Sequence, residues 1–263
     1  MGTTPPRNQP ALACIANPLL VTSALIGAIA LAWWGHSAVN FGYPVLYDAL
    51  AIDDHIAEYG PQNRYKAGFE DTSRTQRLRL FDRMVGAINS GGDGLAELTY
   101  RPAPEAAPIR LLRDKEVVHL NAVADLVTLL HGAGGTAVGI FLVVLAGMRR
   151  ARLQLPWQAP WWGFVAVLAL ALATTLVALD TRDNGWYAWA HDQVFGPEHQ
   201  WFFVYQESLM TTLLKAPDLF APLGASLGVT AIACYAGLCV LARLTLSGSS
   251  SGPDTPPRPT THM

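Results

Sequence analysis

Four long apolar stretches constrain this chain more than any other feature. They occupy residues 17–39, 122–148, 160–179 and 219–241. A helix needs about 20 mostly apolar residues to cross the hydrocarbon core of a bilayer, and each stretch reaches that length. The whole chain is 51% hydrophobic and only 14% charged, whereas an average soluble domain has about 25% charged residues. The sequence therefore predicts an all-α integral membrane protein with four transmembrane helices.

The distribution of basic residues predicts the orientation in the membrane. The short segment 149–159 contains three arginines and no acidic residue, and short basic loops stay in the cytoplasm. Arg7 and Arg243, which flank the first and last spans, favour the same side. We therefore expect the N-terminal residues 1–16 and the Ser- and Pro-rich tail 242–263 in the cytoplasm, with the tail disordered.

The two remaining connections are predicted on the opposite, extracytoplasmic side. Residues 180–218 hold six acidic residues and two basic ones. Residues 40–121 are too long for a simple turn, and long loops cross the membrane largely regardless of charge. We expect both segments to build one small extracytoplasmic domain. Within it, apolar residues of 72–90 recur at helical spacing, so this segment is a helix that either packs on the domain or lies among lipid headgroups.

Composition also argues against several classes of function. A net charge of −2 is untypical of a nucleic-acid-binding protein. The three cysteines, Cys14, Cys234 and Cys239, form no CxxC pair, which argues against thiol–disulfide exchange. HExxH does not occur, and the GxSxG match at 224–228 falls inside an apolar stretch rather than at the strand-to-helix turn that a serine nucleophile needs. No local motif therefore indicates a serine nucleophile or a zinc site. We expect no cofactor and no bound metal.

Two histidines beside the predicted spans are the main candidates for chemistry. His119 precedes the second span, and His199 lies in the segment that leads to the fourth. The predicted topology puts both on one side of the membrane, and imidazole exchanges protons near neutral pH. Glu116 shares the helix face of His119 and is expected to orient its imidazole. Asn121 and Asp125 lie nearby, and an ionisable group at the top of a span is a functional candidate.

Aromatic residues surround the second candidate histidine. Trp201, Phe202, Phe203 and Tyr205 follow it within a few residues. Aromatic side chains are typical of membrane–water interfaces, because one part of the ring is apolar and another is polar. We expect these four side chains to line a groove for a lipid chain and to contact the substrate.

The remaining histidines have simpler interpretations. His131 lies inside the second span, and we expect it to hydrogen-bond a neighbouring helix. We interpret His36, His55 and His191 as solvated polar groups. One alternative stays open, in which His191 joins the two candidate histidines in a zinc site, since zinc prefers nitrogen and oxygen ligands.

Three short stretches resemble one family of membrane proteins. They are EVVHL at 116–120, EHQWFF at 198–203 and APDLF at 216–220. In type and order they are similar to the boxes of a family of four-span membrane proteins that includes the lipoprotein intramolecular transacylase of some Gram-positive bacteria. Ala122 stands where the family has an acidic residue, and Glu198 where it has phenylalanine.

The resemblance implies an activity at the outer face of the bacterial cytoplasmic membrane. An acyl chain leaves the sn-2 position of a diacylglyceryl group and arrives on the α-amine of the N-terminal cysteine of the same lipoprotein. The implied base is His119, oriented by Glu116. His199 protonates the leaving alkoxide or stabilises the oxyanion, and the two histidines are interchangeable at this level. Asn121, Asp125 and the aromatic residues would bind substrate.

The implied partners are the lipid bilayer and a diacylglyceryl-modified lipoprotein. Two other functions remain open. One is a non-catalytic membrane protein that binds lipid or a partner protein through its outer domain. The other is a zinc-dependent lipid hydrolase.

Overall fold

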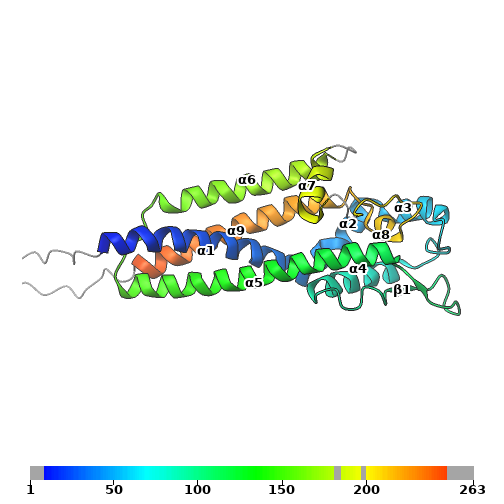
Figure 1. Ribbon diagram of the computed structural model, residues 1–263, viewed down its shortest axis with the longest axis horizontal. Coiled ribbons are helices and arrows are strands. Elements are labelled where there is room, and N and C mark those ends of the chain that lie inside the picture. The colour runs from blue at the N-terminus through cyan, green and yellow to red at the C-terminus, as the bar shows by residue number, and fades with distance from the viewer. Residues whose placement is uncertain (1–8, 181–184, 197–199, 248–263) are drawn as a thin grey trace, which may run out of the picture.

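A helical bundle with a small domain at one end makes up the protein (Figure 1). The computed structural model describes residues 9–180, 185–196 and 200–247. Within these residues, four helices are long and apolar enough to cross a membrane. They are α1 (Gln9–Ala38), α5 (Asp114–Arg150), α6 (Ala159–Leu179) and α9 (Phe220–Ser247). The predicted all-α fold with four membrane-crossing helices is confirmed.

Three of these helices are longer than the apolar stretches within them. α1 starts at Gln9 rather than at residue 17, and α5 starts at Asp114 rather than at residue 122. α9 continues past residue 241, whereas α6 agrees with its predicted span within one residue. Hydropathy marks only the part of a helix that suits hydrocarbon, and hydrogen bonding carries the helix on into polar surroundings.

Small residues bring α1 and α5 together in the bundle. α1 packs against both α5 and α9, and α6 packs mainly against α9. Ala24, Ala28 and Ala32 follow one another at intervals of one helical turn and are buried. At Gly134 of α5, a Cβ atom would overlap the Cβ of Ala30 in α1. Small side chains at such positions let transmembrane helices approach closely.

Short elements build a second unit, which we call the loop domain, from residues 40–112 and 200–219. It lies at the end of the bundle opposite the start of α1 and the end of α9 (Figure 1). Its elements are η1 (Asn40–Gly42), α2 (Tyr43–Ala49), α3 (Ile52–Tyr59), η2 (Gly60–Gln62), α4 (Arg74–Asn89), β1 (Thr99–Tyr100), β2 (Ile109–Arg110) and α8 (Leu209–Leu214). The two strands pair antiparallel. α7 (Trp186–Phe195) lies at the same end and contacts α6.

The loop domain has a hydrophobic core of its own, distinct from that of the bundle. Tyr43 stacks on Phe81 of α4 with ring centroids 3.8 Å apart. Arg77 of α4 is buried, and its guanidinium donates to the Asp53 carboxylate at 2.5 Å. The apolar side of α4 lies in this core, so the helix predicted within 72–90 packs on the domain rather than among headgroups.

α5 connects the two units as one uninterrupted helix. Its 37 residues give a length of about 55 Å at 1.5 Å per residue. The hydrocarbon core of a bilayer is only about 30 Å thick. The first turns of α5 therefore project beyond it into the loop domain, and His119 lies at the junction.

We expect Gly134→Leu to destabilise the fold by about 1–3 kcal/mol, because the added side chain overpacks the contact with α1. Gly135→Leu is the matched control, since a Cβ there meets no atom within 4 Å. Thermal unfolding in detergent measures both variants. Equal melting temperatures would contradict the close α1–α5 contact.

Candidate functional site

A cavity of about 450 Å³, which we call the site cavity, lies where the loop domain meets the transmembrane helices. Side chains of α1, α4, α5, α6, α7, α8 and α9 line it, and most of them are aliphatic or aromatic. Among the described residues, His119 and His191 contribute the imidazoles of its wall. Polar interactions are stronger in such an apolar enclosure than in water.

α5 places His119 in this wall. The residue is only 8% exposed. The ring of Phe195, at the end of α7, meets the imidazole edge-on with centroids 5.2 Å apart. Phe203, from the segment that precedes α8, lies 6.1 Å away. Elements far apart in the sequence thus shield the predicted proton-transfer residue from water.

α7 brings His191 to the same cavity. Its Nδ1 lies 2.8 Å from the carbonyl oxygen of Tyr187, so Nδ1 carries the proton in the neutral ring and Nε2 is the basic nitrogen. The ring stacks on Trp201 with centroids 4.5 Å apart. Burial lowers the pKa of His191. The structure therefore corrects the expectation that His191 is a solvated polar group.

His55 is a second histidine that is not solvated as expected. It is buried in the loop domain, and its ring lies 4.6 Å from that of Tyr59 and 4.5 Å from that of Tyr205. Burial lowers its pKa as well. Both histidines are buried in part by residues from other segments of the chain, Tyr205 and Trp201. The polarity of the neighbouring sequence does not indicate such contacts.

The predicted aromatic residues gather around a second hollow of about 720 Å³ beside the site cavity. Trp201, Phe202, Phe203 and Tyr205 all line it. Trp201 borders both spaces, and its indole N–H donates to the Asp192 carboxylate at 3.0 Å. The structure thus brings the four residues together around one hollow, and their contact with a lipid chain stays a prediction.

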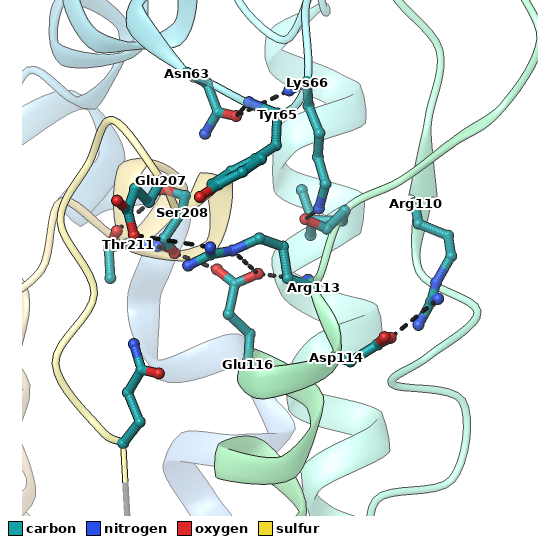
Figure 2. A network of polar contacts seen from close by, with 12 residues as sticks. Asn63, Tyr65, Lys66, Arg110, Arg113, Asp114, Glu116, Glu207, Ser208 and Thr211 are labelled. Carbon is teal, nitrogen blue, oxygen red and sulfur yellow. Dashed lines mark hydrogen bonds and ion pairs between the residues drawn. The ribbon is translucent and has the colours of Figure 1, made fainter.

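Glu116 is fully buried at the start of α5, three residues before His119. One carboxylate oxygen accepts a hydrogen bond from the Ser208 hydroxyl, and the other accepts one from the backbone N–H of Arg113 at 2.5 Å. Ser208 also caps α8, since its hydroxyl accepts the N–H of Thr211 at 3.1 Å. Figure 2 shows this carboxylate joining the two helix starts. An influence of Glu116 on the His119 imidazole stays a prediction.

Two basic side chains complete this polar network (Figure 2). The Arg113 guanidinium lies 3.8 Å from Glu116 and 3.8 Å from Glu207. Lys66 donates to the carbonyl oxygen of Leu111 at 2.6 Å, and burial lowers the pKa of its ammonium group to about 8. Sequence analysis missed Ser208 and Arg113, whose importance depends on a contact across 92 positions in the sequence.

The structure does not bring every predicted residue to the site cavity. Asn121 and Asp125 are exposed and are absent from its lining, because they project from other faces of α5. Asn121 lies against the backbone of Gly92. His199 and Glu198 lie outside the described residues. Among the residues that the structure describes, no three His, Cys, Asp or Glu side chains are grouped to hold a metal ion.

The fold is similar to that of two solved structures. The in meso structure of the membrane integral lipoprotein intramolecular transacylase Lit from Bacillus cereus has a TM-score of 0.65 and 12% identity, covering 91% of this chain and 98% of that chain. A structure of the same protein with a histidine-to-arginine mutation has a TM-score of 0.66 and 13% identity, covering 91% and 94%. No family model and no curated protein matches the sequence. This similarity shows that the chain shares the fold.

We expect Ser208→Ala to lower the free energy of unfolding by about 1–3 kcal/mol, because it leaves a buried carboxylate oxygen without its donor. Ser226→Ala is the control, since the Ser226 hydroxyl donates only to Leu223 O within its own helix. Denaturant titration in detergent compares the two. A loss no larger than that of the control would show that Glu116 does not fasten α5 to α8.

Stability should fall as the pH drops below about 6.5, the ordinary pKa of histidine. Burial lowers the pKa of His191 and of His55 in the folded protein. The unfolded chain therefore binds these protons first, and acid favours unfolding. We expect His191→Gln and His55→Gln each to flatten the decline of the melting temperature between about pH 7 and pH 5. An unchanged decline in both variants would contradict their burial in the neutral form.

Proposed function

We propose that this chain is a membrane acyltransferase that converts diacylglyceryl-modified lipoproteins to the lyso form. It moves an O-acyl chain from the glyceryl group to the α-amine of the N-terminal cysteine of the same molecule. The reaction takes place on the extracytoplasmic face of the bacterial cytoplasmic membrane. The observation that carries the proposal is a buried imidazole, His119, in the wall of an apolar cavity at the end of a membrane-crossing helix. The shared fold supports the same reaction.

The reaction is the aminolysis of an ester. The amine nitrogen forms a bond to the acyl carbon, and the bond from that carbon to the glyceryl oxygen breaks. The proton that the amine loses ends on the glyceryl oxygen. An α-amino group has a pKa near 8, so an imidazole is a strong enough base to remove its proton.

In this proposal one histidine removes the proton from the amine, and another protonates the leaving glyceryl oxygen or stabilises the oxyanion. We assign His119 as the base for the amine and His199 as the group that protonates the alkoxide or stabilises the oxyanion, although exchanged roles give the same chemistry. His191 lines the same cavity with a basic Nε2, which makes it a second candidate partner of His119. Glu116 holds the first turn of α5, and thereby the height of His119, relative to the loop domain.

The enclosure supplies the rest of the catalysis. Nucleophile and ester belong to one substrate molecule, and holding them in contact lowers the barrier without an acyl-enzyme intermediate. The rings of Phe195 and Phe203 beside His119 exclude water, which suppresses hydrolysis of the ester. We assign Trp201, Phe202 and Tyr205, which line the neighbouring hollow, to binding the lipid portion of the substrate. Asn121 and Asp125 remain outside this proposal because they face away from the cavity.

The test uses purified protein with a synthetic diacylglyceryl-cysteine peptide and reads the position of the acyl chain by mass spectrometry. We expect conversion to the N-acyl lyso form by the wild type. His119→Ala should slow it by about 10²–10⁴-fold, the usual contribution of a general base. His36→Ala is the matched control, since His36 lies at the end of α1 and does not line the site cavity. Wild-type protein that binds the peptide without converting it would instead favour a non-catalytic lipid-binding protein.

A further inference from the structure

A second apolar cavity, which we call the deep cavity, lies between the transmembrane helices, and some of its lining side chains, such as Ile26, Leu130 and Leu170, are also exposed on the outside of the bundle. It has a volume of about 410 Å³, and all four membrane-crossing helices contribute to its walls. Trp33, Thr174, Gly224 and Leu227 line both the deep cavity and the site cavity. The two cavities are therefore adjacent, and we call the boundary that these four residues share the connection.

The combined length of the two cavities along α9 matches one leaflet of a bilayer. Phe220, the first residue of α9, lines the site cavity, and Ala231 of the same helix lines the deep cavity. At 1.5 Å per residue these positions are about 17 Å apart along the helix. Half of a hydrocarbon core of about 30 Å is about 15 Å. An acyl chain of a lipid in the adjacent leaflet has this reach.

The walls of the deep cavity suit hydrocarbon and not a headgroup. Its polar side chains are His131 and Thr174, and the Thr174 hydroxyl already donates to the carbonyl oxygen of Leu170 at 3.0 Å. Nε2 of His131 is buried with no hydrogen-bond partner in the described part of the chain, so this nitrogen does not make the expected bond to a neighbouring helix. One imidazole cannot solvate a charged group at this depth.

Gly224 lies in α9 where the two cavities meet. A Cβ atom at Gly224 would meet no atom within 4 Å, whereas a Cβ at Gly228, one turn further along, would overlap Ala171 of α6. Gly228 is thus a packing glycine. The space beside Gly224 is open, and Gly224 lines the walls of both cavities. A larger side chain there would project into the connection rather than into another helix.

We propose that the deep cavity holds the tail of the acyl chain whose ester is attacked at His119, and that Gly224 determines how long a chain fits. This inference rests on the proposed function, because it names the chain that the reaction transfers. The ester lies at the site cavity, and the methylene groups run along α9 past Gly224 toward Ala231. A short chain ends within the site cavity, whereas a long chain needs the connection to the deep cavity.

The test compares Gly224→Leu with Gly237→Leu. Gly237 lies in the same helix, also has open space at its Cβ, and lines neither cavity. Each variant receives diacylglyceryl-cysteine peptides with hexadecanoyl or with octanoyl chains. We expect Gly224→Leu to slow hexadecanoyl transfer by about tenfold or more, because the excluded methylenes lose their burial, and to change octanoyl transfer by less than about twofold. Gly237→Leu should match the wild type with both substrates.

A binding measurement separates this inference from the proposed reaction. Native mass spectrometry of the same peptides bound to each variant requires no turnover, and Gly224→Leu should lose the hexadecanoyl peptide selectively. If the wild type converts neither peptide but this selective loss appears, the proposed reaction fails and the chain site stands. Equal effects of Gly224→Leu on both chain lengths, or none, would overturn the chain site even where the wild type is active. If Gly224→Leu does not fold, Gly224→Ala takes its place in the test. This smaller change should reduce binding of the hexadecanoyl peptide selectively, but by less than Gly224→Leu would.

Discussion

The arrangement of the junction depends on one buried carboxylate. Glu116 has no exposure to solvent, and an unpaired charge in such a place would cost several kcal/mol. Its oxygens are therefore tied to the Ser208 hydroxyl and to the backbone of Arg113. Because Ser208 caps α8, the same group fixes the start of α5 and the approach of the aromatic segment that covers His119. Loss of this contact would weaken the attachment of α8 to the start of α5, the helix that presents the imidazole.

The transmembrane fold was largely predictable from the sequence, because hydrocarbon imposes a length and a polarity on any helix that crosses it. All four spans were found, and the helix containing Arg77 and Phe81 was recognised from its periodicity. The start of α5 at Asp114 was less apparent. Its first turn is polar, and contact with α4 and the hydrogen bond between Glu116 and Ser208 hold it against the loop domain.

The candidate site was only partly predictable. The location of His119 at the end of a membrane-crossing helix and the gathering of Trp201, Phe202, Phe203 and Tyr205 agree with the sequence analysis, whereas their roles stay predictions. His191 was mistaken for a solvated group, because its burial comes from the rings of Trp201 and Tyr187 packed against it. Asn121 was predicted as a site residue because it lies close to His119 in the sequence. A separation of two residues in a helix, however, turns the Asn121 side chain about 200° away from that of His119. Two residues that are close in the sequence can therefore point in nearly opposite directions from a helix.

The continuity of α5 has a mechanical consequence. A helix that runs unbroken from Asp114 to Arg150 fixes the position and direction of the His119 side chain relative to the membrane-crossing part of the same helix. Each added or removed residue within the membrane part would rotate His119 by about 100° and shift it by about 1.5 Å. Such a rotation would turn the ring out of the cavity while leaving hydropathy almost unchanged. The number of residues in α5 between its membrane-crossing part and His119 therefore determines where the imidazole lies, just as the side chains determine what surrounds it.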